Sequence, residues 1–149
     1  MAERGKLTIE RYFSKPDISP YDETNWAFSN IDIKDERGKV IFVQKNSEFP
    51  EAFSLNARSV VASRYAYGEL GTDERENSLR PIIARVSETY GKQAVAKGYL
   101  SESDAKVFSD EIAKLTLSQR VAFNSPVWFN VGTDRYPSRI SKQKTDNYY

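Results

Sequence analysis

The amino-acid sequence predicts an α+β domain in which a β-hairpin precedes three amphipathic helices. Two β-prone runs flank a short polar turn within residues 26–43. Three later segments place apolar residues at intervals of three and four, the spacing that gathers them on one face of a helix. The chain has 149 residues, of which 39% are hydrophobic, so it is long enough for one modest folded domain.

The hairpin prediction depends on the residues around its turn. β-prone residues occupy positions 26–33 and 40–43, and the polar residues 35–38 separate them. Gly38 can adopt the positive φ that such a turn needs. Because an isolated hairpin is only marginally stable in water, we expect this one to lie on the helices or to join another sheet.

Three helices are expected over residues 50–67, 78–97 and 101–119. Pro50 suits the first turn of the first helix, because its missing N–H would have no partner there. Ser78 and Ser101 precede the other two apolar stripes and are candidate N-caps. The segment 69–77, between the first two helices, is interpreted as a charged loop, and its residues 73–76 as a solvated turn.

A dense apolar run follows the third helix and predicts a strand over residues 121–132. Its apolar side chains alternate, which places them on one face of an extended chain: Val121, Phe123, Val127, Phe129 and Val131. Pro126 cannot donate to a sheet ladder, so it indicates a strand edge or a bend. Ser125 precedes that proline and is therefore biased toward an extended backbone.

The composition excludes several classes of function. The chain contains neither cysteine nor histidine, which rules out thiol nucleophiles, disulfides, histidine-dependent triads and the common zinc sites. Its 22 Lys and Arg residues are balanced by 21 Asp and Glu residues, so nucleic acid is disfavoured as the main partner. No apolar run is long enough to span a bilayer and no signal peptide is visible, so we expect a cytoplasmic protein.

The segment 123–132, with the sequence Phe-Asn-Ser-Pro-Val-Trp-Phe-Asn-Val-Gly, closely resembles the segment leading into the catalytic barrel of adenosylcobalamin-dependent (class II) ribonucleotide reductases. Further motifs of that family's N-terminal region follow the same order in residues 49–50, 57–65, 75–80 and 98–100. The resemblance covers roughly residues 21–132. It implies that the hairpin, the three helices and the strand motif precede a ten-stranded α/β barrel that this chain does not contain.

The resemblance also implies an activity and a substrate contact. Members of the family reduce ribonucleotides to deoxyribonucleotides, using adenosylcobalamin to create a cysteine thiyl radical and a cysteine pair as reductant. The family's Ser-Pro step lies at the substrate phosphate. Ser125 matches it, and Asn124 could assist. The structural alternative, that Ser125 only caps a local turn, is weighted equally. No catalytic, cofactor-binding or metal-binding residue is assigned, and we expect the chain alone to be inactive.

The resemblance makes residues 21–132 the reductase N-terminal domain. The polar residues before and after it are interpreted as a flexible N-terminal arm (1–20) and a polar tail or truncated loop (133–149). The implied partners are a ribonucleotide and the rest of the barrel, supplied in cis or by a split gene, and the full enzyme could form a homodimer. Diphosphate and triphosphate substrates remain open. The alternative function is a non-catalytic helical module that docks a partner protein through the exposed apolar motif.

Overall fold

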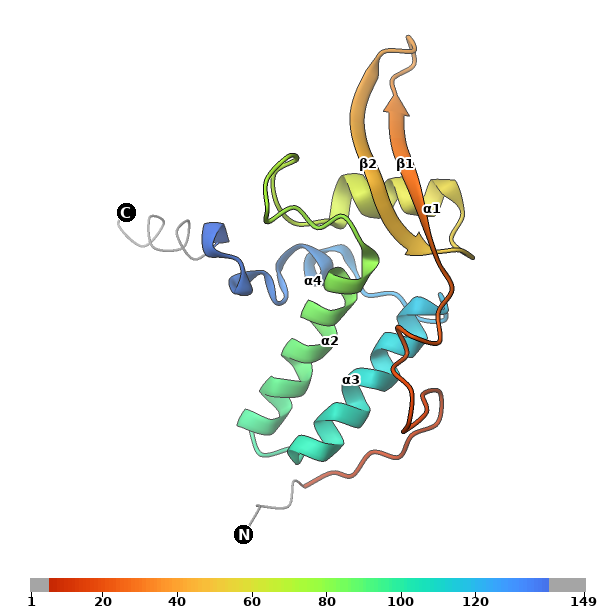
Figure 1. The fold of residues 1–149 in the computed structure, drawn as a ribbon. Coiled ribbons are helices and arrows are strands. Elements are labelled where there is room, and N and C mark those ends of the chain that lie inside the picture. The colour runs from red at the N-terminus through yellow and green to blue at the C-terminus, as the bar shows by residue number, and fades with distance from the viewer. Residues whose placement is uncertain (1–5, 140–149) are drawn as a thin grey trace, which may run out of the picture.

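The computed structural model describes residues 6–139 and shows a hairpin standing on a group of helices (Figure 1). The elements in chain order are β1 (Trp26–Lys34), β2 (Val40–Pro50), α1 (Leu55–Val60) with a π-helical turn (Val61–Tyr65), α2 (Leu79–Ala96), α3 (Glu102–Leu117), α4 (Ser125–Asn130) and a 3₁₀ turn (Thr133–Arg135). The predicted α+β class is confirmed. Within the described range, no helix is both long and apolar enough to cross a membrane.

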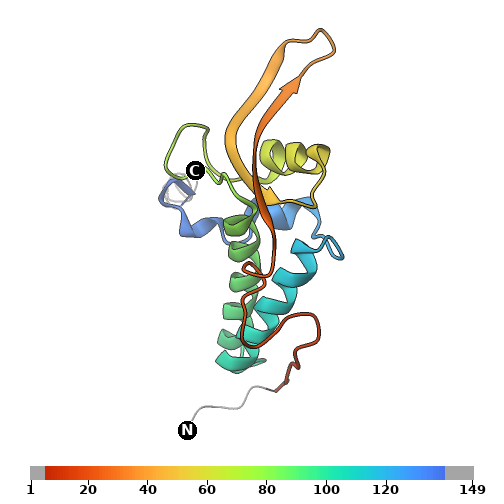
Figure 2. The same ribbon diagram turned by 45° about the vertical axis from the view of Figure 1, so that its right-hand side comes forward.

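The two strands form an antiparallel hairpin whose base belongs to the core and whose tip extends away from the helices (Figures 1 and 2). At the turn, one carboxylate oxygen of Asp35 accepts hydrogen bonds from two backbone N–H groups, and Gly38 adopts a φ of 79°. Ile31 faces the core, whereas Phe28 and Ile41 are exposed. The hairpin therefore turns one face toward the core and exposes single apolar side chains on the other.

The first predicted helix begins later than expected. Pro50 does not open a helix; it ends β2, opposite Trp26. The helix begins after Ser54, whose side chain accepts a hydrogen bond from the Ala57 N–H. Proline is tolerated at the end of an edge strand for the same reason that it is tolerated in a first helical turn, because neither position needs its N–H.

Helices α2 and α3 form an antiparallel pair, and both begin one residue after their expected N-caps. The hydroxyl of Ser78 accepts from the Arg80 N–H, and that of Ser101 accepts from the Asp104 N–H. The helices approach closely at Gly91, where a Cβ atom would lie 2.7 Å from the Ser109 hydroxyl oxygen. This contact accounts for a glycine inside a helix, where it costs about 1 kcal/mol relative to alanine.

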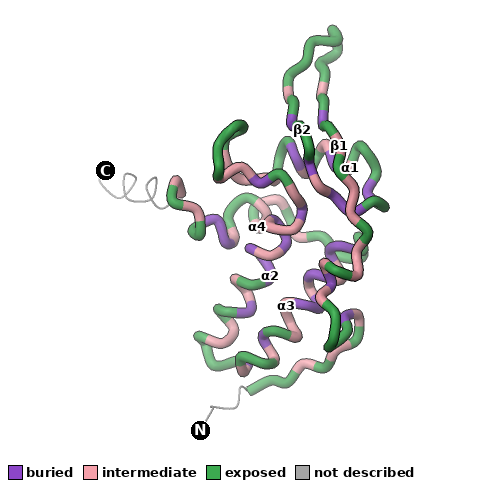
Figure 3. Tube along the Cα trace, in the orientation of Figure 1, coloured by how far each residue is buried: buried purple, intermediate pink, exposed green. Residues whose placement is uncertain are grey.

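The core lies where the hairpin base, the α1 segment and the adjoining ends of α2 and α3 meet (Figure 3). Its buried apolar residues come from all of these elements: Ile31, Phe49, Phe53, Ala62, Leu79, Ile82, Ile83, Ala113 and Leu117. Trp128 of α4 is partly buried and packs against the same cluster. The segment that follows α3 is thus attached to the core by one aromatic side chain.

The expected flexible arm over residues 1–20 is wrong for residues 6–20, which lie along α3. The backbone N–H groups of Phe13 and Ser14 each donate to the Glu111 carboxylate at 2.8 Å. Arg11 forms an ion pair of 2.8 Å with Asp110. Carboxylates on one face of α3 therefore satisfy donors of the arm, which the sequence of the arm alone could not indicate. Residues 1–5 lie outside the described range.

The strand expected over residues 121–132 is also wrong. Residues 121–124 are irregular, and α4 occupies the middle of the motif. The sheet of the described chain has two strands, both in the hairpin, so the motif has no strand beside it to pair with. Pro126 lies in the first turn of α4, where its fixed φ and missing N–H favour a helix start.

Candidate functional site

The two site residues taken from the resemblance lie at the start of α4. Asn124 is the N-cap residue, is exposed, and makes no side-chain capping hydrogen bond. Ser125 is half-buried, and its hydroxyl oxygen lies 3.0 Å from the hydroxyl oxygen of Tyr65. The Tyr65 ring in turn stacks on Phe129, with ring centroids 5.4 Å apart. The Ser125 hydroxyl therefore contacts a residue 60 positions earlier in the chain.

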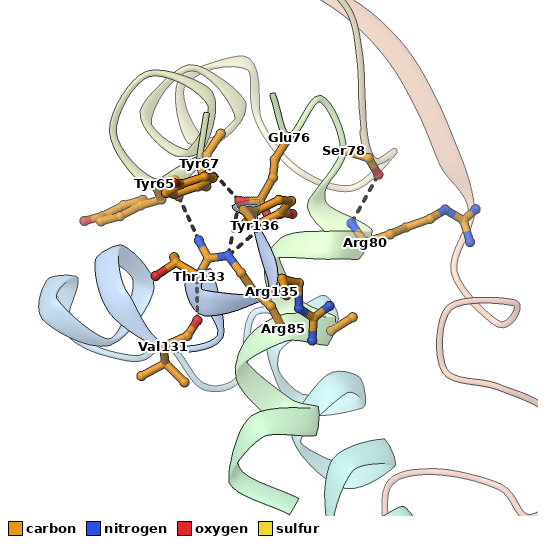
Figure 4. A network of polar contacts seen from close by, with 12 residues as sticks. Tyr65, Tyr67, Glu76, Ser78, Arg80, Arg85, Val131, Thr133, Arg135 and Tyr136 are labelled. Carbon is orange, nitrogen blue, oxygen red and sulfur yellow. Dashed lines mark hydrogen bonds and ion pairs between the residues drawn. The ribbon is translucent and has the colours of Figure 1, made fainter. Parts of the chain in front are cut away.

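One buried arginine ties this site to α2. The Arg85 side chain is 0% exposed, and its guanidinium donates to the Tyr65 carbonyl at 3.1 Å and to the Val131 carbonyl at 2.9 Å (Figure 4). Tyr65 ends the π-helical turn and Val131 follows the last residue of α4. A single guanidinium thus holds both sides of the Ser125–Tyr65 contact.

Glu76 neutralises the charge of this arginine. Its carboxylate is 3.1 Å from the Arg85 Nε and accepts hydrogen bonds from the Tyr67 N–H at 2.8 Å and the Tyr136 hydroxyl at 2.6 Å. Burial raises the pKa of Tyr136, and the hydrogen bond to Glu76 raises it further. The solvated turn expected over residues 73–76 is therefore wrong at Glu76, which is 3% exposed.

The chain after α4 is held against α2 by the same network. Gly132 has a φ of 75°, and a Cβ atom there would lie 2.3 Å from the Arg85 carbonyl oxygen. Four residues later, the Tyr136 ring stacks on Tyr67 with centroids 4.7 Å apart. The part of the expected tail that is described, 133–139, is therefore packed on the domain; residues 140–149 lie outside the described range.

Arg75 holds the other side of the π-helical turn. Its guanidinium donates to the carbonyl oxygens of Ala62, Ala66 and Gly68 at 2.6–3.0 Å, and to the Gln44 side chain at 2.8 Å. Burial lowers the pKa of Arg75. Carbonyl groups that a helix leaves unpaired at its end thus receive donors from a side chain.

A cavity of about 530 Å³ lies beside the candidate site. It is lined mainly by apolar and aromatic side chains of the motif and of α2, among them Tyr65, Ile82, Phe123 and Trp128. Arg120, at the same opening, is exposed. Tyr65 is one of the lining residues, and its hydroxyl contacts that of Ser125, which is not a lining residue.

The chemistry available here is hydrogen bonding. Hydroxyl and amide groups can donate to an anion, whereas no group of three or more carboxylate, imidazole or thiol side chains suited to a metal ion occurs among residues 6–139. Sequence reasoning proposed Asn124 and Ser125 and gave no site role to Tyr65, Glu76 or Arg85. One signal was visible: Arg85 interrupts the otherwise apolar stripe of α2, which indicates a buried charge with a partner.

No protein-family model matches the chain. It is similar to curated proteins called vitamin B12-dependent ribonucleotide reductase. The relative from Streptomyces avermitilis is 44% identical over 137 residues, which cover 91% of this chain and 14% of that protein. The relative from Streptomyces coelicolor is 42% identical with the same coverage, and that from Rhodopirellula baltica is 41% identical over 133 residues, 87% of this chain and 13% of its own length. These matches confirm the resemblance: this chain is homologous to an N-terminal segment of vitamin B12-dependent ribonucleotide reductases.

Proposed function

We propose that this chain is the N-terminal part of a B12-dependent ribonucleotide reductase that makes deoxyribonucleotides from ribonucleotides. The observation that carries the proposal is the 44% identity over 91% of the chain. The chain spans only 14% of that relative's length and contains no cysteine. In this proposal the radical and reducing cysteines therefore come from the remainder of the reductase, in cis or as a split-gene partner.

The substrate contact in this proposal is a phosphate bound by Ser125 and Asn124. A hydroxyl or amide N–H donates well to a phosphate oxygen, since hydrogen bonds to charged acceptors are the stronger ones. Two observations support the assignment: Asn124 is exposed without a capping hydrogen bond, and Ser125 is fixed by Tyr65. The cavity that Tyr65 lines adds apolar surface near this contact, and nucleotide sites combine apolar surface with a few placed donors.

Cobalamin has no evident place on this chain. The sequence offers neither an imidazole nor a thiolate as a cobalt ligand, and the described residues hold no ligand cluster. The residues present therefore do not fit the cofactor, and we assign adenosylcobalamin to the remainder of the enzyme. The role left to this chain is to hold the substrate phosphate and to pack against the barrel.

A second candidate function is a protein-interaction module without catalysis. Large apolar side chains are exposed on the hairpin and on α1: Phe28 is 68%, Ile41 61% and Leu55 70% exposed. Exposed apolar patches mark docking surfaces. Such a module would bind its partner regardless of Ser125, whereas a reductase segment would bind the ribonucleotide more weakly without a hydroxyl at that position.

A chimera tests the proposal. This chain would replace the matching N-terminal segment of the Streptomyces avermitilis protein, and deoxyribonucleotide formation would be measured with adenosylcobalamin and a dithiol. We expect product from the chimera and none from the 149-residue chain alone. A protein lacking the segment serves as the control. Product from the isolated chain, or a folded chimera without activity, would contradict the proposal.

A further inference from the structure

The contact between Tyr65 and Ser125 raises a question of proton direction. Each hydroxyl has one proton to donate, and the two oxygens lie 3.0 Å apart, where either can be the donor. If Ser125 donates to Tyr65, no Ser125 proton remains for a ligand. If Tyr65 donates, the Ser125 proton is free to point at a phosphate oxygen. A phenol is the stronger acid and hence the better donor, so the second arrangement is favoured.

The structure restrains Tyr65 more than a surface tyrosine. Its carbonyl accepts from Arg85 at 3.1 Å, and its ring stacks on Phe129 of α4. Arg75 donates to the carbonyl of Ala66, the next residue, at 3.0 Å. Hydrogen bonds from Arg85 and Arg75 to the backbone therefore fix the position from which the Tyr65 hydroxyl contacts Ser125.

We propose that Tyr65 is a positioning residue that orients the Ser125 hydroxyl so that it donates to the substrate phosphate. The inference rests on the proposed function, because it needs a phosphate at Ser125. Tyr65 donates to the Ser125 oxygen, and Ser125 donates to the anion. Hydrogen bonds in such a chain polarise and strengthen one another. Tyr65 thus acts through Ser125 and does not itself touch the ligand.

The active chimera described above allows the test, with the variants Tyr65→Phe and Ser125→Ala and the double variant. Phenylalanine keeps the stack on Phe129 and removes only the hydroxyl. We expect Tyr65→Phe to raise KM for the ribonucleotide about five-fold, the value of one modest hydrogen bond, with kcat little changed. In the Ser125→Ala background, the same change should have no further effect.

Tyr67→Phe is the matched control. Its hydroxyl lies 2.7 Å from the Ser138 hydroxyl and its ring also stacks, on Tyr136, so it is the same kind of contact away from the motif. We expect KM to remain unchanged. Additive effects of Tyr65→Phe and Ser125→Ala, or equal effects of the two tyrosine changes, would overturn the inference. No effect of Ser125→Ala would instead overturn the phosphate assignment in the proposed function, and the inference with it.

Discussion

Replacing Glu76 by glutamine should destabilise the domain more than any conservative change at its surface. The substitution keeps the shape of the side chain but removes the only carboxylate that is paired with Arg85 among the described residues. The Arg85 side chain is 0% exposed. Breaking a buried ion pair from one side typically costs about 3–5 kcal/mol, because the remaining charge stays buried without compensation. That loss lies between about a fifth and the whole of the roughly 5–15 kcal/mol that holds a domain folded.

Urea unfolding followed by circular dichroism measures this loss. With a denaturant slope of about 2 kcal/mol per molar, the midpoint should fall by about 2 M. Asp73→Asn is the matched control, since Asp73 is exposed three residues earlier and has no hydrogen bond or ion pair in the described structure. Its effect should stay within about 0.5 kcal/mol.

A Glu76→Gln variant whose free energy of unfolding falls by less than about 1 kcal/mol would refute this reasoning, because a buried guanidinium without a carboxylate partner should destabilise the domain by more than that. The double variant Glu76→Gln with Arg85→Met adds a second check. It removes both charges, so its loss should be smaller than the sum of the two single losses. The recovery should be partial, since methionine cannot donate to the Tyr65 and Val131 carbonyls.

Three further predictions concern other parts of the fold. Gly132→Ala should cost about 2 kcal/mol or more in urea unfolding, because alanine disfavours a φ of 75° and its Cβ would meet the Arg85 carbonyl. Burial acts to raise the pKa of Glu111, but hydrogen bonds from the Ser14 hydroxyl and from backbone N–H groups of the arm outweigh it and lower that pKa. The stabilisation from this contact is therefore complete above the ordinary glutamate pKa of about 4 and is lost as pH falls through the lower pKa of the folded state. Limited proteolysis of residues 6–20 should accordingly accelerate in acid. In the Glu111→Gln variant, the rate of cleavage should depend less on pH. Burial raises the pKa of Tyr21 to about 12, so its contribution to stability is complete below pH about 10 and lost as pH rises toward the folded value. Tyr21→Phe should flatten the alkaline fall in urea midpoint, and an unchanged fall would contradict that assignment.

The starts of α2 and α3 were predictable from the sequence because neighbouring residues determine them. Ser78 and Ser101 were identifiable as N-caps because a hydroxyl before an apolar stripe has one main structural use. The two prolines were misplaced in opposite senses: Pro50 ends a strand and Pro126 starts a helix. Neither position needs a backbone N–H, so proline suits both, and only the neighbouring chain decides between them.

The candidate site was predictable only in part. Asn124 and Ser125 came from a contiguous motif with a family resemblance, which a sequence displays directly. Tyr65 lies 60 residues away from its partner hydroxyl, and nothing in the spacing of the two residues connects them. The pairing of Glu76 with Arg85 likewise depends on how the loop before α2 returns over that helix, which is a property of packing and not of local sequence.

The π-helical turn gives the site a dependence on chain length as well as on residue identity. The Ala66 N–H bonds to the Val61 carbonyl five residues back, so this turn contains one residue more than a regular helical turn. Each residue of an α-helix rotates its side chain by about 100°. Removing one residue from this turn would keep Tyr65 in the sequence and redirect its hydroxyl away from Ser125. The contact therefore depends on the number of residues in this turn as well as on their identity. A relative that keeps Tyr65 and Ser125 but has one residue fewer in the turn would lack the contact.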